Sequence, residues 1–203
     1  MGSLGKIIRT VSHLRFRQIY FRIYYKIGSV FSRIIKNKSD FNKRIVVRKL
    51  KLSPFIRPDN ILINNTLNFL NRSKIYTNSL NWEDNQFGLL WAFNLNYFDF
   101  LNQINIEKDE GLALIKDFIF NYDDNSVAKH SYTISLRGIN WIKFVSIHNI
   151  QDIQINSHLF NQYQLLVRRP EYPLMGNHLL ENGLSLLFGA VYFNNKYLMK
   201  KSK

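Results

Sequence analysis

The chain has 203 residues, of which 46% are hydrophobic and 15% aromatic, enough for one domain with a sizeable core or for part of a larger one. It contains no cysteine, which excludes disulfide bonds and thiolate metal sites. Its net charge of +14 lies entirely in residues 1–57, where 15 Lys and Arg stand against one acid, Asp40. Residues 58–203 carry 13 cations and 13 acids and are neutral.

Residues 1–57 are predicted to form a basic N-terminal helical appendage and a hinge. Within them, residues 4–35 have the pattern of one basic amphipathic helix or two shorter ones, and we favour a helix that packs on the body with a solvated cationic face. Contact with a membrane surface or a polyanion is the alternative. Nucleic acid is not expected, because the basic residues match no recognition module. The cations also interrupt every apolar run, so no secretory signal or membrane-spanning helix is predicted, which favours a cytoplasmic or membrane-peripheral location.

The rest of the chain, 58–203, is predicted to be one mainly α-helical domain with a short β-containing N-terminal lead. A strand is expected over 45–52, and short strands and turns over 61–81. Hydrophobic periodicity then predicts five helices, over 87–103, 110–122, 135–150, 157–170 and 176–193. The side chains expected to be buried are Trp91, Phe98, Trp141, Ile142, Leu180, Leu184, Leu187 and Phe188.

The predicted helix over 176–193 has two chemically distinct sides. At 100° per residue, one side gathers Leu180, Leu184, Leu187, Phe188 and Val191, and the opposite side gathers His178, Glu181, Asn182, Ser185 and Gly189. One interpretation of this pattern is structural, with Asn177 only a helix cap and His178 with Glu181 only a surface pair. The functional interpretation is that this polar side lines a cleft, where Glu181 orients an acid/base imidazole and Asn177 presents an amide to an anion. The other histidines, His13, His130, His148 and His158, are expected to be structural or surface residues.

Three segments carry a family resemblance. The stretches "LLWAFNLNYFDFLN" (89–102), "SYTISLRGINWIKF" (131–144) and "EYPLMGNHLLENGLSLLFGAVYF" (171–193) resemble the N-terminal helical domain of heparinase II/III-like proteins, bacterial polysaccharide lyases of the alginate-lyase type. The Asn-His-x-x-Glu-Asn motif is the most specific part. The resemblance implies an incomplete (α/α) toroid of paired helices, and β-elimination on a uronic-acid-containing polysaccharide, without a cofactor or a catalytic metal.

The same resemblance assigns roles to the motif. Asn177 would neutralise the substrate carboxylate, and His178 would assist there or act as the base, so both are predicted catalytic residues. Glu181 would hold His178, and Asn182 would support substrate binding.

Departures from the family pattern change the expected function from a complete lyase to part of one. Ala92 and Asn96 stand where the family commonly has Arg and His, and Tyr132 and Tyr172 are expected to be packing residues. The catalytic Tyr of a later helix and the His of a C-terminal β-sandwich have no counterpart in the chain. We therefore expect a truncated or split lyase that holds part of a site, with a second chain as the partner that completes the toroid. The alternative is a non-catalytic protein that binds an anionic polysaccharide or a membrane surface through its basic N-terminus.

Overall fold

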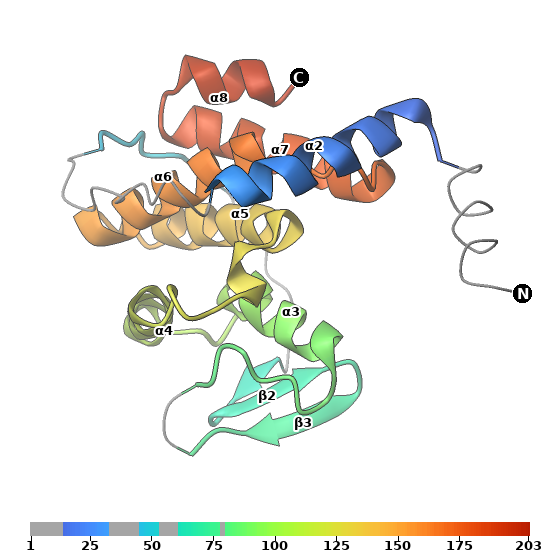
Figure 1. Cartoon of the computed structure of the whole chain (residues 1–203). Helices are drawn as coiled ribbons and strands as arrows, with labels where there is room; N and C mark the ends of the chain where they lie inside the picture. The colour runs from blue at the N-terminus through green and yellow to red at the C-terminus, as the bar shows by residue number, and fades with distance from the viewer. Residues whose placement is uncertain (1–13, 33–44, 53–60, 78–79) are drawn as a thin grey trace, which may run out of the picture.

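The computed structural model describes residues 14–32, 45–52, 61–77 and 80–203 (Figure 1). Within these residues the protein is mainly helical, with a small antiparallel sheet at the end of the molecule opposite α8. The predicted helical and hinge segments over 1–13, 33–44 and 53–60 lie outside the described residues. The α-helices are α2 (Phe16–Ser32), α3 (Leu89–Tyr97), α4 (Lys108–Phe120), α5 (Ser131–Ile147), α6 (Ile153–Arg168), α7 (Gly176–Tyr192) and α8 (Lys196–Lys201).

The sheet confirms the short strands predicted for 61–81. Strands β1 (Leu62–Ile63), β2 (Thr66–Phe69) and β3 (Arg72–Ile75) pair antiparallel in the order β1-β2-β3. Both connections are two-residue turns with positive φ, at Asn64–Asn65 and at Leu70–Asn71, a geometry that suits the twist of a hairpin. The strand predicted over 45–52 is wrong. That segment forms no strand, and its Arg48 N–H donates to the Tyr192 carbonyl at the end of α7, at 2.7 Å, rather than to a neighbouring strand.

Helices α5, α6 and α7 form the part of the fold that carries the motif. Helix α6 runs antiparallel to α5, because Arg137 meets Gln162 while Trp141 lies next to His158. It also runs antiparallel to α7, since a Cβ on Gly189 would meet the Tyr163 ring and the Tyr192 hydroxyl donates to Asn156 at 2.8 Å. Helices α5 and α7 therefore run in the same direction, and α6 packs against both.

The aromatic core confirms half of the predicted burial, four of the eight side chains. Trp91, Phe98, Trp141 and Ile142 are fully buried. The Phe98 ring stacks on Trp82 at 5.0 Å and meets the Phe118 and Trp141 rings edge-on. Phe98 adopts a left-handed φ of 61°, which ends α3 at Tyr97 before the predicted limit of 103 and starts a short 3-10 helix, η1 (Asp99–Asn102).

Helices α4, α5, α6 and α7 overlap the predicted ranges, with ends displaced by up to four residues, whereas no helix is predicted where α8 lies. Helix α8 is only six residues long, too short for a clear period. Its N-terminus is fixed by the Asn195 side chain, which accepts hydrogen bonds from the N–H groups of Tyr197 and Leu198 at 2.9 and 3.0 Å. None of the helices in the described parts of the chain combines the length and the hydrophobicity that crossing a bilayer requires.

The burial predicted for α7 is wrong for its leucines. Leu180, Leu184 and Leu187 are 63%, 43% and 40% exposed, and Phe188 is half-buried. The inward side of α7 is instead the one with Asn182, Ser185 and Gly189, all buried. These small and polar residues let α7 approach α5 and α6 closely. The Ser185 hydroxyl donates to the Ser135 carbonyl of α5 at 2.9 Å, a contact that a leucine could not make.

Helix α2 packs on the turn that leads into α7. The Phe21 ring stacks on Tyr172 at 4.4 Å, and the Arg17 guanidinium lies 5.0 Å from the centre of the same tyrosine ring. The Gln18 side chain donates to the Pro173 carbonyl at 3.2 Å. The described part of the basic segment thus contacts the body next to the Asn-His motif.

Candidate functional site

The motif residues lie at the N-terminal end of α7, but Asn177 does not cap it. The chain enters the helix through Met175 and Gly176, both with positive φ, and Met175 occupies the capping position without a side-chain cap. Asn177 follows within the first turn and is exposed. Because the Asn177 side chain does not cap the helix and is exposed, its amide is accessible to a ligand.

His178 is half-buried between a carboxylate and a phenol ring. Its Nδ1 lies 3.4 Å from Glu171 Oε1, and its ring centre is 4.4 Å from that of Tyr132. The 3.4 Å contact is an ion pair when the imidazole is protonated, and it is too long for a strong hydrogen bond. The carboxylate beside His178 is thus Glu171, seven residues earlier in the chain. Glu181 lies one turn further along α7, where burial raises its pKa, Lys143 opposes that rise and Asp99 adds to it.

Asn182 is buried and holds the Glu171 segment in place. Its side-chain oxygen accepts from the Glu171 N–H at 2.7 Å. Its amide nitrogen donates to the Ser135 hydroxyl at 3.0 Å and to Glu171 Oε2 at 3.3 Å. At 1% exposure Asn182 has no surface to offer a substrate, so its place in the site is that of a positioning residue.

Two tyrosines extend the site from α7 across α5 to α3. The Tyr97 and Tyr132 rings meet edge-on at 5.8 Å. Burial raises the pKa of Tyr97 to about 12, and burial also raises the pKa of Tyr132, helped by the charges of Glu181, Glu171 and Asp99. Both phenols therefore keep their protons at neutral pH. Tyr132 is therefore more than the packing residue that the sequence predicts. Because Tyr132 and His178 are 46 positions apart, their contact leaves no local signal in the sequence.

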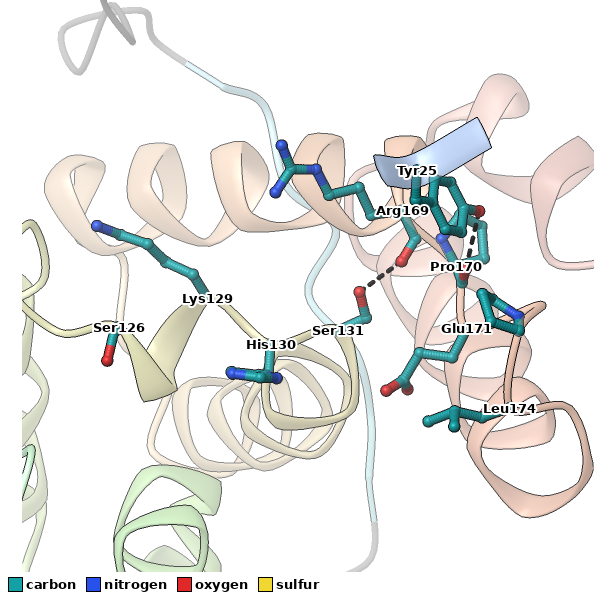
Figure 2. Close-up of a pocket in the computed structure, with 10 residues that line it drawn as sticks. Tyr25, Ser126, Lys129, His130, Ser131, Arg169, Pro170, Glu171 and Leu174 are labelled. Carbon is teal, nitrogen blue, oxygen red and sulfur yellow. Dashed lines mark hydrogen bonds between the residues drawn. The ribbon is translucent and has the colours of Figure 1, made fainter. Parts of the chain in front are cut away.

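A hollow of about 410 Å³ is lined in part by Glu171, the carboxylate that lies beside His178 (Figure 2). In Figure 2, Lys129 and Glu171 lie on opposite sides, with His130 and Ser131 between them. The Tyr25 hydroxyl of α2 donates to the Pro170 carbonyl at 2.9 Å, and the Ser131 hydroxyl donates to the Arg169 carbonyl at 2.5 Å. The lining residues are Tyr25, Ser126, Lys129, His130, Ser131, Arg169, Pro170, Glu171, Pro173 and Leu174.

The hollow combines cations, hydroxyls and an aromatic ring with one carboxylate, that of Glu171. Cationic side chains of this kind form charge-assisted hydrogen bonds with carboxylates. Lys129 and Arg169 supply its positive charge, and the Lys129 ammonium also donates to the Asp123 carbonyl at 2.6 Å. Neither Asn177 nor His178 is part of its lining. A ligand that contacted both the hollow and His178 would have to extend across Glu171.

Two other predicted positions have structural roles. His158 is buried with its ring centre 4.5 Å from that of Tyr122, and burial together with the Arg137 charge lowers its pKa to about 3. Asn96 is fully buried and donates to the carbonyls of Trp82 and Ala92 at 2.7 and 2.8 Å. Among the described residues, no cluster of three or more His, Asp or Glu side chains is placed to hold a metal ion.

The chain matches no family model, no curated protein and no solved structure. The likeness to heparinase II/III-like proteins therefore rests on the quoted residues alone.

Proposed function

We propose that the chain is the N-terminal helical part of a heparinase II/III-like polysaccharide lyase, folded as an incomplete (α/α) toroid. The toroid is supported by the pairing of α6 with two helices, α5 and α7, that run in the same direction. The observation that carries the function is the contact of His178 with both the Tyr132 ring and the Glu171 carboxylate at the N-terminal end of α7, where the exposed Asn177 immediately precedes His178. The substrate class is a uronic-acid-containing polysaccharide.

The chemistry of β-elimination suits these residue types. A base takes the proton from C5 of the uronate, the C4–O4 bond breaks, a C4–C5 double bond forms, and the departing O4 takes up a proton. The exposed Asn177 amide would neutralise the carboxylate, which makes the C5 proton more acidic. His178 would remove that proton. Tyr132, whose raised pKa keeps its phenol protonated, would supply the proton to O4.

The neighbouring hollow gives an acidic polymer a place to continue. A carboxylate on the sugar beside the reacting one would meet Lys129 and Arg169, while Tyr25 and Ser131 offer a ring and a hydroxyl. Glu171 would then separate the two sugar positions. This arrangement favours a polymer substrate over a single sugar.

The test is binding and cleavage of defined polymers. The full chain is incubated with heparosan, alginate and hyaluronan, and the ultraviolet absorbance of the unsaturated uronate is followed while binding is measured in parallel. We expect one polymer to bind, and His178→Ala and Arg169→Gln each to weaken that binding about tenfold. Ile153→Gln, an exposed change on α6, is the control. Polymer binding that is indifferent to His178 and Arg169 would refute the proposed site.

A second candidate function is favoured by the exposed side of α2. Phe16, Tyr20, Ile23 and Tyr24 are each more than half exposed on the same helix as the exposed Arg22, the composition of a helix that lies on an anionic membrane or polymer. If this surface is the binding site, Arg15→Glu together with Arg22→Glu abolishes binding, and His178→Ala does not change it.

A further inference from the structure

The side of α7 opposite Asn182 carries an apolar stripe that solvent reaches. Leu180, Leu184, Leu187 and Val191 are 63%, 43%, 40% and 38% exposed. Their spacings of four, three and four residues keep them within about 60° of arc. This is the spacing of the seam against which a second helix packs in a coiled coil.

The stripe borders a hollow rather than a flat surface. The hollow, of about 340 Å³, lies between α7 and the C-terminal end of α8 and is lined by Gly176, Leu179, Leu180, Gly183, Leu184, Leu187, Ser202 and Lys203. Gly176 and Gly183 put backbone rather than side chains on part of its wall. Space of this shape accepts the side chains of a packed helix, whereas a flat bilayer surface would leave it unfilled.

The charges beside the stripe select an acidic partner. Residues 196–203 carry four exposed lysines, Lys196, Lys200, Lys201 and Lys203, and Lys203 lines the hollow. Glu181 is the one acid between residues 176 and 203, and it lies about 100° around α7 from Leu180. A helix with carboxylates along the edge that faces α8 would complement these lysines. A second copy of the chain would bring the same lysines and a net charge of +14, which opposes self-association.

We propose that the apolar stripe of α7 and the hollow beside α8 form a docking groove for an amphipathic α-helix of a partner protein, apolar at heptad spacing and acidic along one edge. The groove lies on the side of α7 away from Asn182 and Ser185. The inference does not rest on the lyase proposal, because none of its residues belongs to the Asn177–His178 site.

The test uses the full chain and a fluorescent helical peptide of about three heptads, with Leu at the a and d positions and Glu at the flanking ones. A peptide with Lys in place of the flanking Glu and a peptide of scrambled order are the comparisons. We expect the Glu peptide to bind, and Leu184→Gln and Leu187→Gln each to weaken its binding about tenfold. Lys203→Glu should weaken the Glu peptide and strengthen the Lys peptide. Ile153→Gln, which changes a side chain of similar exposure on α6, should have no effect.

Several results would overturn the inference. Equal binding of the Glu and Lys peptides would show that the groove does not prefer an acidic helix. Binding unaffected by Leu184→Gln would show that the peptide binds elsewhere on the protein. Sedimentation that shows self-association lost in Leu184→Gln would assign the groove to a second copy. Binding to anionic vesicles that is lost in the same variant would assign it to a membrane. Because these changes replace exposed side chains, circular dichroism should show unaltered folding. Polymer binding through His178 is measured separately, so either proposal can fail without the other.

Discussion

Two asparagines in the first two turns of α7 show how burial decides what a residue does. Asn177 is exposed, whereas Asn182 is buried with both ends of its amide engaged. In the sequence both belong to the same motif and have the same chemistry. The first is available to a ligand, and the second positions the Glu171 segment beside His178.

This difference predicts unequal effects of the same substitution. Asn182→Ala leaves the Glu171 N–H without its acceptor and the Ser135 hydroxyl without its donor, so we expect the free energy of unfolding to fall by about 1–3 kcal/mol. Asn177→Ala, at an exposed position, should change it by less than about 0.5 kcal/mol. Urea denaturation followed by circular dichroism measures both. Equal losses in the two variants would mean that the buried amide does not hold this segment.

At the scale of the element, α7 shows that an amphipathic pattern does not decide which side of a helix is buried. Its leucine side is the more hydrophobic, yet the side with Ser185 and Gly189 faces α5 and α6. The reason is the close approach of α7 to its neighbouring helices. The absence of a side chain at Gly138 and Gly189 makes room for the buried Tyr163 ring between the helices, and the Tyr163 hydroxyl lies 3.2 Å from that of Ser185.

A single methyl group tests this packing. In Gly189→Ala the new Cβ would lie 2.8 Å from the Tyr163 ring, closer than atoms can approach, and we expect a loss of about 1–3 kcal/mol in unfolding free energy. Helix propensity alone would give the opposite sign, a gain of about 1 kcal/mol. Thermal and urea unfolding distinguish the two. In the background of Tyr163→Leu, which removes the ring, the penalty for Gly189→Ala should largely disappear.

At the scale of the whole molecule, a buried polar group joins the helices around the aromatic core. Arg137 is fully buried, and its guanidinium donates to Gln162 of α6 at 2.6 and 2.8 Å, to the Ala128 carbonyl at 2.7 Å and to the Asn96 carbonyl of α3 at 3.2 Å. Burial lowers its pKa to about 10, so it is still charged at neutral pH. Burial lowers the pKa of His158 on α6, and the positive charge of Arg137 lowers it further. The His158 ring lies against Tyr122, which follows α4, and against Trp141 of α5.

Stability should therefore fall in acid. The pKa of His158 is about 3 in the folded chain and 6.5 in the unfolded chain, so the unfolded chain binds the proton first. The stability that the neutral imidazole provides is complete above about pH 6.5 and is lost as the pH falls toward about 3, by up to about 1.4 kcal/mol per pH unit.

Urea midpoints at about pH 7 and about pH 4.5 measure this loss. His158→Phe should flatten the pH dependence, because the variant has no imidazole to protonate in the core. The matched control is His130→Gln, at an exposed position, which should keep the dependence of the unaltered chain. An unchanged slope in His158→Phe would show that other groups cause the acid sensitivity.

Local sequence determined most of the helix ranges and the aromatic core. The periodicity of 110–122, 157–170 and 176–193 corresponds to α4, α6 and α7, because such patterns depend on residues a few positions apart. Trp91 and Trp141 are buried as expected, since large aromatic side chains lose the most by contact with water. The motif at 177–178 was also visible in the sequence, and its assignment to a lyase remains a proposal drawn from resemblance.

Only the tertiary structure decided which side of α7 turns inward, and which residues surround His178. Glu171 and Tyr132 reach it from a turn and from another helix, and their approach depends on how closely Ser185 and Gly189 let α7 pack. Sequence patterns report a preference along one element. The distance between two elements is set by the side chains of both, and that distance placed the polar side of α7 in the core and Leu180, Leu184 and Leu187 at the surface.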